Sequence, residues 1–311
     1  MKRPLYNAIH SLCCNPRHFV AALLYRFGGW IPDRPYVKII YWLATQEKLD
    51  LENPRKFNEK LQWLKLYNQR PEYTAMADKI AVKDVVRRLI GDEYVVPTLC
   101  VYDKITDIKW SELPNQFVLK TNHDSGGNGV IICREKSNFS IPKAIKQLKK
   151  SLSRNSFILG REWPYKNIEK KIFVEQYLSD DKNIGINDYK FYCFNGQVKV
   201  MFVCSDRADG KLKINYYDEN FNPLKISQGH KQNAIENITK PSTFDQMKML
   251  AEKLSVGIPH VRIDFFEVAG RVYFSEFTFF DSGGLAPFTP DEWNYILGDS
   301  IALPEKYVEI K

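Results

Sequence analysis

The sequence predicts an α+β protein in which helices pack on antiparallel strands. Three observations lead to this class: a helix-rich region over residues 1–77, a change to short strands from Tyr94 onward, and an Asn195-Gly196 pair between two apolar runs. Asn-Gly in that setting is the strongest short signal of a β-hairpin, and hairpins join antiparallel strands. A chain of 311 residues is long enough for two lobes.

Helical spacing dominates the first part of the chain. Apolar residues recur at intervals of three and four from Phe57 to Tyr67, the pattern of one buried helix face. Asp78 is placed to cap a second helix that continues to Ile90. The apolar stretch over residues 19–31 is too short to span a bilayer, so we expect a buried helix there, with contact to a membrane surface as the alternative.

Strands, hairpins and two amphipathic helices are expected in the rest of the chain. The clearest hairpins turn at Asn195-Gly196 and at Ala269-Gly270. Helical patterns around Ile145 and after Ser242 interrupt the strands. The other expected strands are residues 95–102, 116–121, 129–134 and 172–177.

The composition limits the possible functions. A formal net charge of +8 favours anionic ligands such as nucleotides or acidic glycans. The basic residues are spread along the chain without a nucleic-acid-binding signature, so no nucleic-acid partner is expected. The six cysteines contain no C-x-x-C pair, which indicates the reducing cytosol. The five histidines lack the spacing of a zinc site.

A strand that ends in lysine runs into a glycine-rich loop. Lys120 closes the apolar run, and Gly126, Gly127 and Gly129 follow. Glycines let backbone N–H groups close on phosphate oxygens, and the lysine would add positive charge. The spacing differs from a Walker A loop. A flexible hairpin loop is an equally weighted alternative for this segment.

The last hairpin carries its polar residues on one face. Arg262 and Asp264 alternate with apolar residues, as do Glu276 and Thr278. We expect a three-residue connection over 269–271, because it pairs Asp264 with Glu276, whereas a strict two-residue turn would shift the pairing by one. Two carboxylates roughly 5 Å apart would suit Mg²⁺ held jointly with substrate phosphates. A structural salt bridge between Arg262 and Glu276 is the alternative.

Two further strands each carry a charged residue of ambiguous function. Glu175 lies in an expected strand whose backbone would read an adenine edge, while its side chain accepts from the adenine amino group. A solvent-facing strand residue is the simpler interpretation. Lys190 alternates with aromatic residues and would be a further phosphate lysine, with an exposed lysine as the alternative.

In chain order, these segments resemble the ATP-grasp superfamily, and most closely its TupA-like branch, which is named for teichuronopeptide biosynthesis and belongs to bacterial surface-polysaccharide loci. The resemblance extends from about Asn53 to Leu303. It is carried by residues 53–63, 78–79, 117–120 with the glycine loop, 188–190, 276–278 and 282–284.

The resemblance implies ATP and Mg²⁺ held between two α+β lobes, after a helical N-terminal extension. The implied divisions are residues 1–77, 78–180 and 181–311. It further implies a set of roles: phosphate lysines at Lys79 and Lys120, a phosphate flap with Gly126, Gly127 and Gly129, an adenine hinge of Glu175, Gln176, Tyr177 and Leu178, γ-phosphate neutralisation by Lys190 and Arg262, and metal ligands at Asp264 and Glu276. Thr278 stands where many ATP-grasp enzymes have an asparagine ligand, and its hydroxyl would bind metal more weakly.

The implied activity is that of an ATP-dependent carboxylate–amine ligase acting through an acyl phosphate in capsular or other surface-polysaccharide biosynthesis. The substrate would be an amino acid or amine joined to a uronic acid or similar acidic glycan. The cytosol is the expected location, with contact to a lipid-linked glycan or to the inner face of the membrane as an extension of it. A glycosyltransferase that uses a nucleotide-sugar, and a non-catalytic nucleotide-binding protein, are the alternatives.

Overall fold

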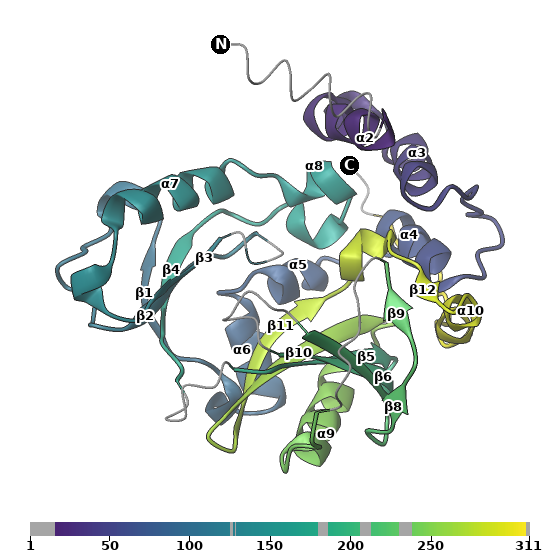
Figure 1. Ribbon diagram of the computed structural model, residues 1–311. Coiled ribbons are helices and arrows are strands. Elements are labelled where there is room, and N and C mark those ends of the chain that lie inside the picture. Colours follow the sequence, from purple (N-terminus) through teal and green to yellow (C-terminus); the bar gives the residue numbers. More distant parts are fainter. Residues whose placement is uncertain are drawn as a thin grey trace.

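The computed structural model describes residues 16–124, 127, 129–179, 186–205, 213–229 and 238–308. Helices pack on antiparallel sheets, which confirms the α+β prediction (Figure 1). The main helices are α2 (Pro16–Phe27), α3 (Asp33–Thr45), α4 (Phe57–Tyr67), α5 (Glu72–Ala77), α6 (Val82–Leu89), α7 (Ile141–Leu152), α8 (Ser156–Gly160), α9 (Phe244–Ser255) and α10 (Glu292–Asp299). Short 3₁₀ turns include η1 (Gly28–Trp30), η5 (Trp163–Tyr165) and η7 (Asp281–Gly284).

A four-stranded sheet forms the smaller of two cores. Its order is β1-β4-β2-β3, with every neighbouring pair antiparallel. The strands are β1 (Thr98–Tyr102), β2 (Phe117–Thr121), β3 (Val130–Cys133) and β4 (Ile172–Gln176). One face of this sheet packs on α7, where Leu119 and Val174 are fully buried with Leu148. Because side chains alternate along a strand, Lys120 and Glu175 lie on the other face.

A six-stranded sheet forms the centre of the larger core. Its order is β11-β10-β5-β6-β7-β8. Its strands are β5 (Asp188–Phe194), β6 (Gln197–Ser205), β7 (Lys213–Asp218), β8 (Pro223–Leu224), β10 (Val261–Val268) and β11 (Arg271–Thr278). Helix α9 covers one face through Phe244, which packs against Phe191 (Figure 1). A small ribbon pairs β9 (Ser227–Gln228) with β12 (Phe288–Thr289).

The β10–β11 hairpin has the predicted pairing but not the predicted turn. Asp264 lies opposite Glu276, and Arg262 lies opposite Thr278. The connection has two residues, Ala269 and Gly270, both with positive φ, so the expected three-residue connection is wrong. A bulge at Ser275 moves the pairing by one residue and restores the expected partners.

Helix α4 belongs to the larger core and is not a separate appendage. Phe57 and Leu61 are fully buried, and the Phe57 ring packs edge-on against Tyr192 and Phe288. Val82 of α6 is also buried in this core. The predicted division into three parts stays a prediction.

The expectation of a buried helix over residues 19–31 is wrong for one side of that segment. Helix α2 and η1 leave Phe27 and Trp30 largely exposed, at 61% and 82%. Among the described residues, no helix combines the length and apolar character needed to cross a bilayer.

Candidate functional site

The larger sheet carries a buried network of charges on the face opposite α9. Arg262 is its centre: its Nε donates to Asp264 Oδ1 at 2.7 Å, and its Nη2 donates to Asp264 Oδ2 at 2.8 Å and to Thr278 Oγ1 at 3.0 Å. The same Nη2 lies 3.5 Å from Glu276 Oε1. Lys190 of the neighbouring strand β5 pairs with Asp264 and lies 3.6 Å from Asp188. The pairing of Asp264 with Lys190 across β10 and β5 follows directly from the strand register.

Asp281 completes this network, and the sequence analysis missed it. Its carboxylate accepts from Arg262 Nη1 and, at 2.7 Å, from the Tyr192 hydroxyl. The residue is almost fully buried in η7, directly after β11 ends. It stands between the apolar Phe279-Phe280 pair and Ser282-Gly283-Gly284, beyond the end of the strand, where alternation does not reveal which side chains are buried.

Mutual attraction keeps this network ionised despite its burial. Burial raises the Asp264 pKa, but Arg262 and Lys190 outweigh it and hold that pKa below its ordinary value. Burial lowers the Lys190 pKa, but the carboxylates of Asp264 and Asp188 have the larger effect, and the pKa lies above its ordinary value. Arg262 behaves in the same way, with Asp264 and Asp281 raising its pKa well above the usual value. Asp264, Lys190 and Arg262 are therefore held in their charged forms at neutral pH.

This face is rich in carboxylates, the kind of ligand that a divalent cation takes. In the described part of the chain, Asp188, Asp264, Glu276 and Asp281 form ion pairs with Lys190 and Arg262. No three His, Cys, Asp or Glu side chains of the described chain are grouped so as to hold a metal by themselves. Mg²⁺ suits such a site because it takes one or two carboxylates together with phosphate oxygens. Glu276 has the most accessible carboxylate of the four, with 32% of its side chain exposed.

The smaller sheet contributes a second charged cluster around Glu175. Its Oε2 lies 2.5 Å from Lys120 Nζ, and its Oε1 lies 2.6 Å from Lys83 Nζ. Burial raises the Glu175 pKa, but the two lysines outweigh burial and lower it. The carboxylate thus holds Lys120 in position. The predicted contact of Glu175 with an adenine amino group is untested, and both of its oxygens already have lysine partners.

Lys79 lies between the two clusters. It is placed just after α5, and its Nζ donates to the backbone oxygen of Asp124 at 2.5 Å. Burial lowers the Lys79 pKa; Glu276 opposes this effect and Lys120 adds to it. Lys79 is therefore within electrostatic reach of both the metal-binding candidate Glu276 and the phosphate lysine candidate Lys120.

The predicted glycine loop is described only in part. Gly126 lies outside the described residues. Gly127 has a φ of +74°, which glycine adopts without strain, with open space on its Cβ side. Gly129 has a structural reason to be glycine, because a Cβ there would lie 2.2 Å from Thr121 Oγ1.

The predicted adenine hinge is at the end of strand β4. Gln176 is its last residue and is exposed, and Tyr177 and Leu178 follow, both half-buried. On the face that carries Lys120, the strand register also places Val101 and Ile132, which are 46% and 51% exposed. These two side chains lie on opposite edge strands of the sheet, β1 and β3, with Lys120 and Glu175 on the strands between them.

Helix α4 holds the turn that carries Asp281. Gln62 Nε2 donates to the backbone oxygens of Gly283 and Gly284, and Lys65 Nζ donates to Gly283 at 2.6 Å. Gly284 has a φ of +62°, and a Cβ there would come within 2.6 Å of Gln62 Nε2. The packing of α4 therefore requires glycine at position 284.

Glu162 and Lys65 form an unexpected titratable pair beside this turn. Burial raises the pKa of Glu162 to about 7, which Lys65 opposes. Burial lowers the pKa of Lys65 to about 8, which Glu162 opposes. Tyr165, the last residue of η5, lies within electrostatic reach of both Glu162 and Glu276. The segment before β4 therefore borders the charged network.

The Glu162 pKa predicts a pH dependence of stability. Because the folded-state pKa is above the ordinary value of about 4.3, this group stabilises the fold fully below about pH 4 and loses that contribution as pH rises to about 7. We expect Glu162→Gln to remove this loss. The melting temperature of wild type minus that of the variant should fall by a few degrees between pH 5 and pH 7.

The comparison with the variant is needed because His260 acts in the opposite direction. Its buried ring has a pKa lowered to about 3, chiefly by burial, so its contribution to stability rises with pH over the same range. That contribution is common to both proteins and cancels in the difference. A difference that stays constant from pH 5 to pH 7 would contradict the raised Glu162 pKa.

Two more buried polar groups border the Arg262 network. The Tyr216 hydroxyl and Gln228 Nε2 have no hydrogen-bond partner within the described chain, although both residues are only 1% exposed. The Gln228 amide oxygen accepts from Tyr192, and Tyr216 is in electrostatic contact with Asp281 and Arg262. Unpaired buried polar groups beside a charged centre are suited to bind a polar substrate group.

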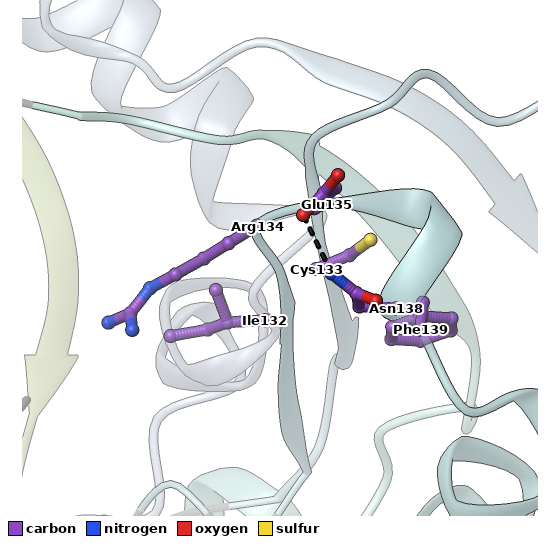
Figure 2. A pocket seen from close by; sticks show the side chains of 6 residues that line it. All are labelled: Ile132, Cys133, Arg134, Glu135, Asn138 and Phe139. Carbon is purple, nitrogen blue, oxygen red and sulfur yellow. Dashed lines mark hydrogen bonds between the residues drawn. The ribbon is translucent and has the colours of Figure 1, made fainter.

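The smaller sheet also borders a surface hollow of about 490 Å³ (Figure 2). It lies at the β3 edge of the smaller sheet, and none of the predicted site residues lines it. Its lining consists of Ile132, Cys133, Arg134, Glu135, Asn138 and Phe139.

The sequence profile of the TupA-like ATP-grasp proteins matches residues 59–302. The chain belongs to the TupA-like ATP-grasp family. This confirms the resemblance, the ATP-grasp fold and the expectation of an ATP-grasp enzyme. The matched TupA-like region runs from α4 to just beyond α10, so it includes both charged clusters and the turn that joins them to α4.

Solved structures with a similar fold are ATP-grasp ligases. The D-alanine–D-alanine ligase of Helicobacter pylori has 15% identity and a TM-score of 0.43 over 73% of this chain and 61% of that one. The N5-carboxyaminoimidazole synthetase of Staphylococcus aureus, complexed with ADP, has 14% identity and a TM-score of 0.40 over 89% and 60%. The ligase PsnB, complexed with a precursor variant, Mg and ADP, has 13% identity and a TM-score of 0.41 over 94% and 72%.

These likenesses concern the fold alone. The chain spans about 60% of the length of the first two ligases. No curated protein matches the chain. The assignment of the TupA-like family therefore rests on the sequence match, and the ADP and Mg belong to those other proteins.

Proposed function

We propose that this TupA-like protein is an ATP- and Mg²⁺-dependent carboxylate–amine ligase of surface-polysaccharide biosynthesis. The observation that supports it most is the pair of charged clusters: Lys120 and Lys79 on one side, and the carboxylate-rich Arg262 network on the other. A triphosphate with its metal needs cations for the phosphates and carboxylates for the metal in one place.

The residues would share the work as follows. Lys79 and Lys120 would neutralise the phosphates, and Glu175 would keep Lys120 aligned. Glu276, with Thr278 beside it, would hold Mg²⁺, which would withdraw charge from the phosphate oxygens. Asp264, the other predicted ligand, is fully buried with both oxygens bound by Arg262 and Lys190.

Arg262 and Lys190 would act in the chemical steps. A carboxylate oxygen of the substrate attacks the γ-phosphorus of ATP, the bond to the β-phosphate oxygen breaks, and ADP leaves. An amine then attacks the acyl carbon; the C–O bond to phosphate breaks, and the amine loses a proton. Charge accumulates on oxygen in both steps, and fixed cations such as Arg262 and Lys190 stabilise it without reorganising.

The proposed substrate is acidic, a uronic acid or similar glycan acid, whose hydroxyls would meet the unpaired Tyr216 and Gln228 groups. The overall charge of +8 favours the approach of such an anion.

The nucleotide part of the proposal is tested by thermal stability. Mg-ATP at about 100 times its Kd should stabilise the wild-type protein by about 2.7 kcal/mol. Lys120→Ala should weaken this effect, because the phosphate cation is lost. The matched control is Lys146→Ala, which removes an exposed lysine of α7 in the same part of the chain.

Two results would contradict the proposal. One is an equal Mg-ATP shift in wild type and Lys120→Ala, which would remove Lys120 from the nucleotide site. The other is stabilisation by UDP-sugars and not by adenine nucleotides, which would favour the glycosyltransferase alternative.

A further inference from the structure

Helix α2 and the turn after it expose a stripe of large apolar side chains. Val20, Leu23, Phe27 and Trp30 follow one another at intervals of three, four and three residues, which places them along one side of the helix. Their exposed fractions rise along the stripe, from 40% and 42% to 61% and 82%. We call these four residues the α2 stripe. A monomeric soluble protein rarely keeps such side chains together in water.

Basic side chains accompany the α2 stripe. Residues 16–45 contain Arg17, Arg26, Arg34 and Lys38 against the single acid Asp33, a net charge of 4 − 1 = +3. Arg26 lies over the Phe27 ring, with its guanidinium carbon 5.5 Å from the ring centroid. Apolar and aromatic residues beside arginines form the composition of helices that lie in the headgroup region of a bilayer.

The segment is fixed to the body of the protein, so the exposed side has a defined orientation. Arg161 Nη2 donates to the backbone oxygens of Gly28 at 2.9 Å and Ile31 at 3.2 Å. Its guanidinium also pairs with Asp33 and stacks 3.9 Å from the Tyr36 ring centroid. Figure 1 shows α2 and α3 at an outer corner of the molecule, next to α8.

We propose that residues 16–45 dock the protein on an anionic membrane surface through the α2 stripe. The α2 stripe could be covered by a membrane or by a second copy of the chain, and the charge favours the membrane. A segment with a net charge of +3 is attracted by anionic lipids and is repelled by the same segment of a second copy. Docking would also set the position of the reaction centre, since Arg161 directly precedes Glu162, which borders the Asp281 turn. A substrate carried by a lipid would then be presented on that side.

The test is co-sedimentation of the full chain with vesicles, without nucleotide. Wild type should bind vesicles of equal parts phosphatidylcholine and phosphatidylglycerol and bind pure phosphatidylcholine much less. Phe27→Ser with Trp30→Ser should lower the partition coefficient at least about tenfold. Arg17→Ser with Arg26→Ser should lower it about 25-fold at low salt, about fivefold for each basic residue.

The control variants remove similar groups elsewhere. Val256→Ser replaces an apolar side chain that is 71% exposed after α9, and Arg271→Ser replaces an exposed arginine at the tip of the β10–β11 hairpin. Both should bind vesicles like wild type. All variants should keep the wild-type melting temperature and Mg-ATP stabilisation, so a failure of vesicle binding does not bear on the proposed ligase site.

Three results would overturn the inference. The first is wild-type protein that stays in the supernatant with anionic vesicles. The second is equal vesicle binding by wild type and both double variants. The third is a lipid-free dimer that Phe27→Ser with Trp30→Ser converts to monomer, which would show that a second copy covers the α2 stripe.

Discussion

Replacing Asp281 by alanine is expected to lower the free energy of unfolding by about 3–5 kcal/mol. The substitution removes the acceptor of Arg262 Nη1 and the nearer of the two acceptors of the Tyr192 hydroxyl, and both donors are buried. Removing one partner of a buried ion pair leaves the remaining charge with less compensation for its desolvation. The measurement is urea unfolding of the Asp281→Ala protein without nucleotide.

The matched control for Asp281 is an acid in an exposed ion pair. Asp245→Ala removes the partner of Lys240, and these side chains are 81% and 44% exposed, so the change should stay below about 1 kcal/mol. If Asp281→Ala does not fold, Asp281→Asn keeps an acceptor for Tyr192 and isolates the loss of charge. A destabilisation by either Asp281 variant no larger than that of the control would rule out the central role of Asp281.

Replacing Glu276 by alanine should have the opposite profile, with little change in stability and a large loss of activity. Its pairing with Arg262 is long, at 3.5 Å, and its side chain is 32% exposed, so the stability change should be below about 1 kcal/mol. Loss of this carboxylate removes the most accessible candidate ligand of Mg²⁺. The rate of ADP formation from Mg-ATP should fall at least about 100-fold, as for other electrostatic groups at reacting centres.

The control for Glu276 is Glu292→Ala, which removes an exposed acid at the start of α10. It should leave both stability and ADP formation unchanged. A Glu276→Ala protein with near-normal ADP formation would exclude Glu276 as a metal ligand. The Asp281 and Glu276 variants thus distinguish an acid that stabilises the network from an acid that would bind the metal.

The strands were predictable because alternation is a local property. The alternation of polar and apolar residues in β10 placed Arg262 and Asp264 on one face, and the structure agrees. The bulge at Ser275 was also visible in principle, since Phe274 and Phe277 are both buried although they are three residues apart. A strand with one extra residue must shift its alternation in this way.

The parts of the site that the sequence did not predict depend on contacts between residues far apart in the chain. Glu175 occupies the strand predicted for it, but its partners Lys83 and Lys120 come from other elements, and no local pattern reveals them. Asp281 follows the end of a strand, where alternation no longer applies. The apolar spacing of α2 likewise indicated a helix but not which side of it the rest of the protein would cover.

The contacts of α4 have a consequence for synthesis of the chain. Gln62 and Lys65 bind the backbone of Gly283 and Gly284, which follow more than 200 positions later. A ribosome makes these partners last, so α4 must wait for nearly the whole polypeptide before the Asp281 turn can form. Contacts this distant in sequence are slow to form. The reaction centre is therefore expected to be assembled late, and a chain released before residue 281 would contain both phosphate lysines but no complete network to face them.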